Sequence, residues 1–261
     1  MINKYAYQDI SWKSEYPMGY EAYCKAWDVH LTSPLSNDDF YQSLDKIAIR
    51  RSAVLAEIER MPIKNLSKLD GIISRGMDLL LCSVGLLVLA IPFLITSIVI
   101  KLSSPGPIFY RQARVGKGGR VFQIIKFRTM YNDAERGTGP IWAVTNDSRR
   151  TTVGAFLKQT RLDELPNLFN ILKGEMAFVG PRPERPEFVY QFVQYIPAFN
   201  RRHEVTPGLT GLAQLRNGYD DSALSVYKKL RWDANYMKRK CLRLDLQILY
   251  HTGIAVLQGK V

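Results

Sequence analysis

The sequence predicts an α+β protein that is mostly helical, with one membrane element and one small β-hairpin. Three observations lead to this prediction: an uncharged apolar run from Leu79 to Ile100, an alternating apolar and basic segment from Ile108 to Met130, and helical apolar spacing on both sides of them. The chain has 261 residues, which is enough for one large domain or two small ones. With 46% hydrophobic and 23% charged residues, it is neither disordered nor of low complexity.

The charge of the chain is uneven and suggests two parts. Residues 1–65 hold 8 Lys or Arg against 9 Asp or Glu, whereas residues 66–261 hold 28 against 15. We therefore predict a polar, partly helical N-terminal extension over residues 1–65 and a main domain over residues 66–261. The net charge of +12 favours an anionic partner, which can be a nucleic acid, a phospholipid surface or a phosphorylated substrate.

The extension contains one predicted helix, from Ser36 to Arg60. Ser36 or Asn37 can cap its N-terminus. An apolar stripe with helical spacing runs along it: Leu44, Ile47, Val54, Leu55 and Ile58. This pattern favours a small helical appendage that packs on the main domain, and a helix that docks a partner protein is the alternative.

The 22 uncharged residues from Leu79 to Ile100 predict a membrane element. A straight helix of that length is about 33 Å long, which is enough to cross the hydrocarbon core of a bilayer. Pro92 interrupts the run, and basic residues flank it on both sides. Since basic flanks favour the cytoplasmic side, the helix can enter, break at Pro92 and return. A spanning helix with a tolerated kink explains the run equally well.

The segment after the apolar run predicts a β-hairpin. Apolar and basic residues alternate around Gly116, Gly118 and Gly119. The glycines match neither a Walker loop nor a dinucleotide fingerprint. Basic residues of this segment, Lys126 and Arg128 among them, can contact substrate phosphates or lipid headgroups, or can form a solvated basic face.

Adjacent carboxylates at Asp163 and Glu164 predict the chemistry. A helical pattern follows them, with Pro166 in its first turn, so the helix macrodipole would keep Asp163 ionised. An ionised carboxylate can attack phosphorus, and its neighbour can hold Mg²⁺. Arg182, in a rigid Pro-Arg-Pro turn, suits a diphosphate, and Lys158 adds positive charge. The simpler interpretation of the Asp-Glu pair is a charge pair at a helix N-terminus.

Two further segments have an ambiguous aromatic or apolar face. In Pro186–Arg202, the residues with helical spacing are Phe188, Phe192, Tyr195, Ile196 and Phe199. They predict either a stripe that faces the core or a helix that lies in the membrane interface. The C-terminal stretch from Leu242 to Lys260 allows the same two interpretations.

The order of these motifs resembles the bacterial sugar transferases, or monotopic phosphoglycosyl transferases, in their exopolysaccharide-priming branch. The matching segments contain Arg75 and Asp78, SPGPIFYRQARVG at 104–116, KFRTM at 126–130, VGAFLKQTRLDELPNLFNILKGEMAFVGPRP at 153–183, TPGLTGLAQ at 206–214 and LDLQIL at 244–249. The resemblance covers about residues 66–261. It implies a re-entrant membrane helix at about residues 76–101, broken at Pro92, interfacial helices and a catalytic body on the cytoplasmic face of the bacterial inner membrane.

The resemblance also implies a reaction. A UDP-sugar gives its sugar 1-phosphate to polyprenyl (undecaprenyl) phosphate, which releases UMP and begins exopolysaccharide or other surface glycan synthesis. It implies that Asp163 is the nucleophile that forms a phosphosugar intermediate, that Glu164 is tied to Mg²⁺ and that Arg182 contacts a substrate phosphate. Lys158 stands where the family usually has Arg, so a fork-like phosphate contact is lost there.

Asp233 and Tyr236 match a spacing of the exopolysaccharide-priming branch, and they bind substrate or form a structural pair within a helix. An inactive membrane adaptor on the same scaffold is the alternative function, but intact Asp163, Glu164 and Arg182 disfavour it. The apolar run and the absence of a recognised binding motif disfavour nucleic acid. We expect UDP-sugar, polyprenyl phosphate and membrane phospholipid as partners, and the pattern allows a homo-oligomer.

Overall fold

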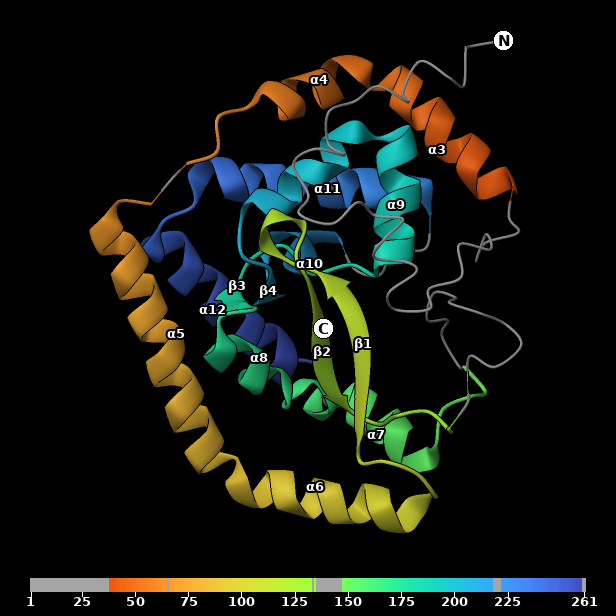
Figure 1. Cartoon of the computed structure of the whole chain (residues 1–261), viewed down its shortest axis with the longest axis vertical. Helices are drawn as coiled ribbons and strands as arrows, with labels where there is room; N and C mark the ends of the chain where they lie inside the picture. Colours follow the sequence, from red (N-terminus) through yellow and green to blue (C-terminus); the bar gives the residue numbers. More distant parts are fainter. Residues whose placement is uncertain (1–37, 65, 133, 135–146, 218–221, 260–261) are drawn as a thin grey trace.

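The computed structural model describes residues 38–64, 66–132, 134, 147–217 and 222–259. In chain order its elements are α3 (Asp38–Arg50), α4 (Ser52–Arg60), α5 (Lys68–Val88), α6 (Ala90–Ser103), β1 (Phe109–Val115), η1 (Lys117–Gly119), β2 (Val121–Phe127), α7 (Thr152–Gln159), η2 (Leu162–Glu164), α8 (Asn167–Lys173), β3 (Ala177–Val179), α9 (Pro186–Tyr195), η3 (Pro197–Glu204), β4 (Gly208–Thr210), α10 (Leu212–Asn217), α11 (Ala223–Arg239) and α12 (Leu242–Leu257). The described part is mostly helical with two small sheets, which confirms the predicted α+β class (Figure 1).

The helices of the N-terminal extension pack on the main body. The predicted single helix is interrupted at Arg51, so α3 and α4 are separate, and the predicted caps Ser36 and Asn37 lie outside the described residues. Leu44, Leu55 and Ile58 are buried in one core cluster with residues of α9, η3 and α11. Figure 1 shows α3 and α4 along the edge of the body nearest α9 and α11. The extension therefore contributes to the main core, while a boundary near residue 65 remains a prediction.

Two successive helices, α5 and α6, form the predicted membrane element. α5 begins at Lys68, earlier than predicted, because Ser67 caps it through the backbone N–H of Asp70. The break lies at Leu89 (φ −92°, ψ 6°), three residues before the predicted Pro92. This offset has a physical reason: a proline lacks the N–H that would bond to the carbonyl four residues earlier, and its ring clashes with that carbonyl. The distortion is therefore expressed upstream of Pro92.

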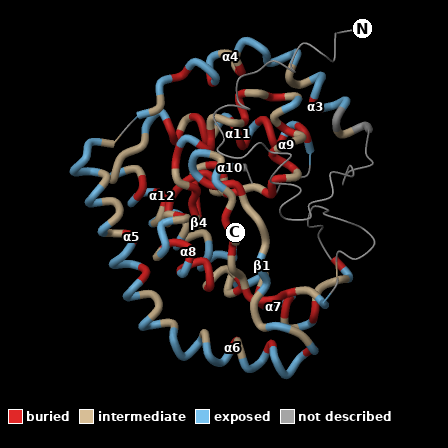
Figure 2. The backbone as a smooth tube through the Cα atoms, viewed as in Figure 1, coloured by how far each residue is buried: buried red, intermediate tan, exposed pale blue. Residues whose placement is uncertain are grey.

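The apolar side chains of α5 and α6 are largely exposed. Leu87 is 80% exposed, Ile91 70% and Leu102 82%. Figures 1 and 2 show the two helices as a bent outer edge of the molecule, mostly exposed or partly buried. Among the described helices, α5 alone is long and apolar enough to cross a membrane. This uncovered apolar surface is what a bilayer would cover.

One polar face of α5 anchors the membrane element to the body. Arg75 donates two hydrogen bonds to the last carbonyls of α8, to Ile171 O at 2.7 Å and to Leu172 O at 2.8 Å. Asp78, which is buried, accepts the backbone N–H of Phe178 in β3 at 3.1 Å. α5 thus holds the end of α8 and the middle of β3, two elements that lie between Glu164 and Arg182 in the chain.

The predicted β-hairpin is present. β1 and β2 pair antiparallel from Phe109 opposite Phe127 to Val115 opposite Val121. Gly118 (φ 63°) and Gly119 (φ 72°) make the connection, where left-handed backbone favours glycine. β3 and β4 form a second, parallel pair.

The aromatic segment Pro186–Arg202 faces the core, as one of its two interpretations predicted. Phe188, Phe192, Ile196 and Phe199 are at most 3% exposed, so this segment does not supply the interfacial surface. α12 differs, because its Leu246 is 49% and its Leu257 is 89% exposed, while Asp245 and Ile248 are buried.

Packing of the extension on the body can be measured with two substitutions in α3. Leu44 is fully buried, whereas Ile49 is 54% exposed. We expect Leu44→Ala to lower the free energy of unfolding by about 2–4 kcal/mol, because it leaves a cavity in the shared core. Ile49→Ala is the matched control and should change it by less than about 0.5 kcal/mol. Equal small effects in thermal or denaturant unfolding would show that α3 is not part of the core.

Candidate active site

The predicted nucleophile Asp163 lies on a single 3-10 turn, η2, between α7 and α8. Arg161, just before it, has left-handed backbone (φ 60°), an uncommon conformation for a residue other than glycine. Asp163 is 5% exposed. α8 begins only at Asn167, so Pro166 is its N-cap and not a residue of its first turn as predicted, and Asp163 lies in the separate turn η2 before it.

The environment of Asp163 also differs from the predicted one. Burial raises the pKa of its carboxyl group above the ordinary value, and Lys126 opposes this rise. Within the described residues, the carboxylate accepts no hydrogen bond from a protein donor. The sequence predicts that a helix dipole keeps Asp163 ionised, whereas in the structure desolvation by burial is the largest influence on its pKa. A carboxylate that accepts no hydrogen bond from protein donors keeps its oxygens available to attack a substrate once it is ionised.

Glu164 has the opposite environment. Its Oε1 accepts Lys126 Nζ and Arg182 Nη2, each at 2.6 Å. Burial by itself would raise the pKa of Glu164, but Arg182 and Lys126 outweigh it and hold the pKa well below the usual range. The pKa values of the two neighbouring carboxylates are therefore shifted in opposite directions. Glu164 is firmly ionised, whereas Asp163 is less easily ionised. Such a separation is typical of groups that have different roles in one reaction.

Lysines from two other elements complete the cluster. Lys126, near the end of β2, and Lys158, in the last turn of α7, both lie within electrostatic range of Asp163. Burial lowers the pKa of each amine, and Asp163 raises it again in part. The structure thus gathers five residues that the sequence analysis singled out from four segments of the chain, β2, α7, η2 and the turn after β3: Lys126, Lys158, Asp163, Glu164 and Arg182.

The guanidinium of Arg182 is only partly used by the protein. One nitrogen, Nη2, donates to Glu164, and within the described residues Nη1 and Nε have no hydrogen-bond partner. The side chain is 31% exposed, the most accessible member of the cluster's ion pairs. Its open edge has the geometry to donate to a phosphate.

Arg128 has a position other than the predicted one. It caps the end of α6: Nη1 donates to Pro105 O at 2.6 Å, and Nη2 donates to Ser104 O at 2.7 Å and to Ser104 Oγ at 2.9 Å. β2 ends at Phe127, so the two-residue alternation that would place Arg128 beside Lys126 stops there. Arg128 therefore ties α6 to the body, which replaces the substrate contact that we predicted.

Asp233 and Tyr236 are buried polar residues of α11, not substrate-facing ones. Asp233 is 2% exposed and accepts two hydrogen bonds from Arg202. Tyr236 is 1% exposed and donates to Asp245 at 2.9 Å. Burial raises the pKa of Asp233. Both residues therefore make structural contacts, but with separate partners and not as a pair within the helix, and neither lies in the cluster around Asp163.

A second charged network lies behind Arg182, and we did not predict it. Glu184 accepts Lys229 Nζ at 2.5 Å, and guanidinium groups of Arg114 and Arg202 lie 3.8 Å from its oxygens. These cations hold the pKa of Glu184 at about 2, although burial would raise it. The residues of this network are spread from β1 to α11, so no spacing along the chain predicts it. The one local indication is the charged Glu184 directly after the Pro-Arg-Pro turn.

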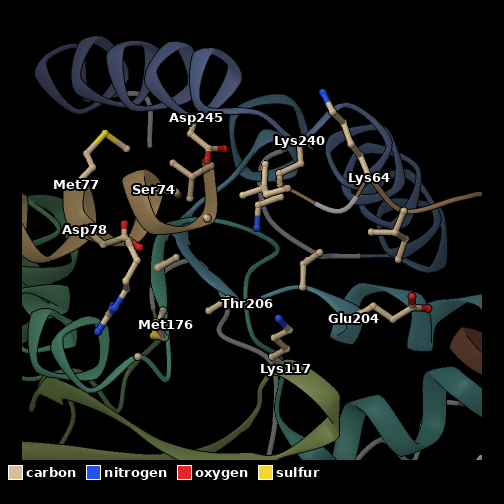
Figure 3. A pocket seen from close by; sticks show the side chains of 18 residues that line it. Lys64, Ser74, Met77, Asp78, Lys117, Met176, Glu204, Thr206, Lys240 and Asp245 are labelled. Atoms are coloured by element: carbon tan, nitrogen blue, oxygen red, sulfur yellow. The ribbon is translucent and has the colours of Figure 1, made fainter. Parts of the chain in front are cut away.

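A separate cavity of about 460 Å³ lies between α5, β3 and the start of α12 (Figure 3). Lys64, Lys117 and Lys240 line it together with Asp78 and Asp245. Its two aspartates already accept hydrogen bonds from the protein, from Phe178 N and from Tyr236. The residues that line this cavity include none of the cluster around Asp163.

The cluster offers few protein ligands for a metal ion. Among the described residues, no group of three or more His, Cys, Asp or Glu side chains is arranged to hold one. Oε2 of Glu164 accepts no hydrogen bond from these residues, so it is open to a cation. Mg²⁺ is usually bound by one or two carboxylates together with substrate phosphates and water. The donor set therefore fits Mg²⁺ that arrives with a phosphorylated substrate.

Comparison with known proteins identifies the family of the chain. Residues 69–259 match the family model for the bacterial sugar transferases. The chain is 42% identical over 193 residues to the UDP-N-acetylgalactosamine-undecaprenyl-phosphate N-acetylgalactosaminephosphotransferase of Aeromonas hydrophila, covering 74% of this chain and 45% of that protein. It is 39% identical over 185 residues to the UDP-glucose:undecaprenyl-phosphate glucose-1-phosphate transferase of Xanthomonas campestris pv. campestris, covering 70% and 38%.

A third relative is similar over nearly its whole length. The exopolysaccharide production protein PSS of Rhizobium leguminosarum bv. phaseoli is 35% identical over 200 residues, which are 74% of this chain and 99% of that protein. This chain belongs to the bacterial sugar transferase family. It spans less than half the length of the Aeromonas and Xanthomonas relatives. The relatives' link to undecaprenyl phosphate and the apolar α5 together indicate membrane association.

Two aspartates with opposite pKa shifts test the environment of Asp163. The pKa of Asp163 is raised on folding, so its ionised form lowers the stability of the fold at pH 7, and we expect Asp163→Asn to raise the thermal midpoint. Arg149 lowers the pKa of Asp147 to about 2, which stabilises the fold above pH 4, so Asp147→Asn should lower the midpoint. Thermal unfolding at pH 7 measures both. A fall in the midpoint for Asp163→Asn would contradict the desolvated carboxylate.

Proposed function

We propose that this protein transfers a sugar 1-phosphate from a UDP-sugar to polyprenyl phosphate and releases UMP. The observation that carries this proposal is Asp163: a buried carboxylate with no hydrogen bond from the described residues, beside Lys126, Lys158 and the open edge of Arg182. The names of the Aeromonas and Xanthomonas relatives support this reaction. The name of the Rhizobium relative supports a role in exopolysaccharide or other surface glycan synthesis.

The proposed reaction has two displacements at one phosphorus atom. First, a carboxylate oxygen of Asp163 attacks the β-phosphorus of the UDP-sugar, the bond to the bridging oxygen breaks, and UMP leaves with that oxygen. Then a phosphate oxygen of polyprenyl phosphate attacks the same phosphorus, the acyl phosphate bond breaks, and Asp163 is free again. The products are polyprenyl diphosphate sugar and UMP, and no proton donor is needed for either bond cleavage to balance.

Each member of the cluster has a role in this scheme. Arg182 donates from its open edge to the diphosphate, and Lys126 and Lys158 offset the charge that develops on phosphoryl oxygens. Glu164 fixes Lys126 and Arg182 in place through Oε1. Through Oε2 it would hold Mg²⁺, which would neutralise charge on the phosphates when bound.

A nucleotide-release assay tests the proposed function. Detergent-solubilised protein is mixed with Mg²⁺, undecaprenyl phosphate and a panel of UDP-sugars that includes UDP-N-acetylgalactosamine and UDP-glucose. We expect lipid-dependent UMP, lost on chelation of Mg²⁺ and reduced on the order of 10⁴-fold or more in Asp163→Asn, as is usual for loss of a nucleophile. Release of UDP would mean ordinary glycosyl transfer and would overturn the proposal. Turnover that persists in Asp163→Asn would remove the nucleophile assignment.

We further propose that α5 and α6 enter the inner membrane from the cytoplasmic face and return to it. The break at Leu89 and the anchoring of both helices to one body, by Arg75 and by Arg128, support a re-entrant path. Both anchors lie on the same body, so a spanning path would have to separate them.

Tags at residues 1 and 261 test this path in spheroplasts. If the path is re-entrant, an added protease should reach either tag only after the membrane is permeabilised. Cleavage of one tag in intact spheroplasts, with the other protected, would show a spanning helix instead. A cytoplasmic marker protein is the control for spheroplast integrity.

A further inference from the structure

Two consecutive arginines of η3 bind different parts of the molecule. Arg201 donates from Nη1 to Glu59 O at 2.9 Å and from Nη2 to Met61 O at 2.6 Å, so it caps the end of α4. Arg202 is 2% exposed and turns toward the Pro-Arg-Pro turn and α11. The pair therefore offers two similar side chains on one element, of which only Arg202 contacts the proposed phosphate-binding turn.

The guanidinium of Arg202 joins Arg182 to Asp233. Its Nη2 donates to the backbone carbonyl oxygen of Arg182 at 2.9 Å and to Asp233 Oδ2 at 2.8 Å, and its Nε donates to the same Oδ2 at 3.1 Å. The guanidinium carbon also lies 4.8 Å from the ring centroid of Phe199. Because Asp233 fixes the guanidinium plane in a buried site, the donor aimed at Arg182 has little freedom to move.

The backbone around Arg182 explains why one hydrogen bond at this point matters. Pro181 and Pro183 fix their own φ angles, so the freedom left in the turn lies mainly in the peptide groups beside Arg182. The carbonyl of Pro181 accepts Gly208 N at 2.9 Å, which holds one side of the turn. The Arg202 bond holds the carbonyl on the other side. Arg114 Nη1 also donates to Pro183 O at 3.1 Å, so three hydrogen bonds restrict the direction in which the Arg182 side chain leaves the backbone, and the Arg202 bond is the one to Arg182 itself.

We propose that Arg202 is a positioning residue, which fixes the phosphate-binding turn through the carbonyl of Arg182, and that Asp233 acts only by holding Arg202. This inference rests on the proposed function, in which Arg182 contacts the donor diphosphate. Arg202 itself has no route to the substrate, because it is buried behind Arg182 and against Glu184. It also assigns a role to Asp233, the residue for which spacing along the chain had suggested a substrate contact.

The test compares Arg202→Lys with Arg201→Gln. Lysine keeps the charge but cannot donate to Asp233 and to the Arg182 carbonyl from a rigid plane. We expect Arg202→Lys to weaken UDP binding, measured by calorimetry, and to lower kcat/KM for the donor, each about tenfold or more, because small misplacements of a binding group are costly. The KM for polyprenyl phosphate should not change. Arg201→Gln removes two comparable hydrogen bonds from the same element and should lower only the thermal midpoint.

A double-mutant cycle separates positioning from general loosening. If Arg202 acts through Arg182, then Arg202→Lys should have little further effect on UDP binding in an Arg182→Gln background. Asp233→Asn keeps the side-chain shape and should weaken UDP binding less than Arg202→Lys does, again with little further effect in the Arg182→Gln background. This variant replaces Arg202→Lys if Arg202→Lys does not fold. Three outcomes would each overturn the inference. In the first, the losses of UDP-binding free energy in Arg202→Lys and Arg182→Gln add fully. In the second, Arg202→Lys binds UDP as tightly as the wild type, and in the third, Arg201→Gln loses as much UDP affinity as Arg202→Lys. Failure of the proposed function is distinguishable, because the wild type would then neither bind UDP nor release UMP.

Discussion

The carboxylate of Glu164 joins three segments of chain that are distant in the sequence. Its Oε1 accepts both Lys126 from β2 and Arg182 from the turn after β3, at the same distance of 2.6 Å. Buried ion pairs add little net stability, because desolvation offsets most of their attraction. The more important effect of these ion pairs is on geometry. They keep Glu164 ionised and hold the cationic groups of Lys126 and Arg182 beside Asp163. Asp163 accepts no hydrogen bond from the part of the chain that the structure describes, and its neighbour Glu164 makes the contacts that order the site.

The membrane element is connected to this site through hydrogen bonds at helix ends. Arg75 of α5 donates to the last carbonyls of α8, the helix that follows the Asp163 turn. Arg128, two residues after Lys126, donates to the carbonyls of Ser104 and Pro105 directly after α6. Helix ends leave carbonyls without partners, and a buried guanidinium can satisfy two of them at once. The same two arginines therefore connect the membrane helices to β2, which carries Lys126, and to α8, which follows the turn of Asp163.

Much of the site could be predicted from the sequence because it lies in short, dense motifs. Asp163, Glu164 and Arg182 were found from residue type and spacing, and the hairpin from its alternation. Other features depend on distant contacts that no local pattern encodes. The break at Leu89 follows from the clash that Pro92 imposes upstream, the role of Arg128 from the point at which β2 ends, and the role of Arg202 from packing of η3 against α11. The raised pKa of Asp163 comes from burial, and burial is set by the complete fold.

The covalent intermediate is the central claim, and it can be observed directly. The purified protein is incubated with Mg²⁺ and the active UDP-sugar, labelled in the β-phosphate, without polyprenyl phosphate, and then rapidly quenched. We expect a label on the protein that peptide mapping places at Asp163, that polyprenyl phosphate removes, and that Asp163→Asn does not acquire. An enzyme that turns over but acquires no label under these conditions, or a label that persists in Asp163→Asn, would contradict catalysis through this carboxylate.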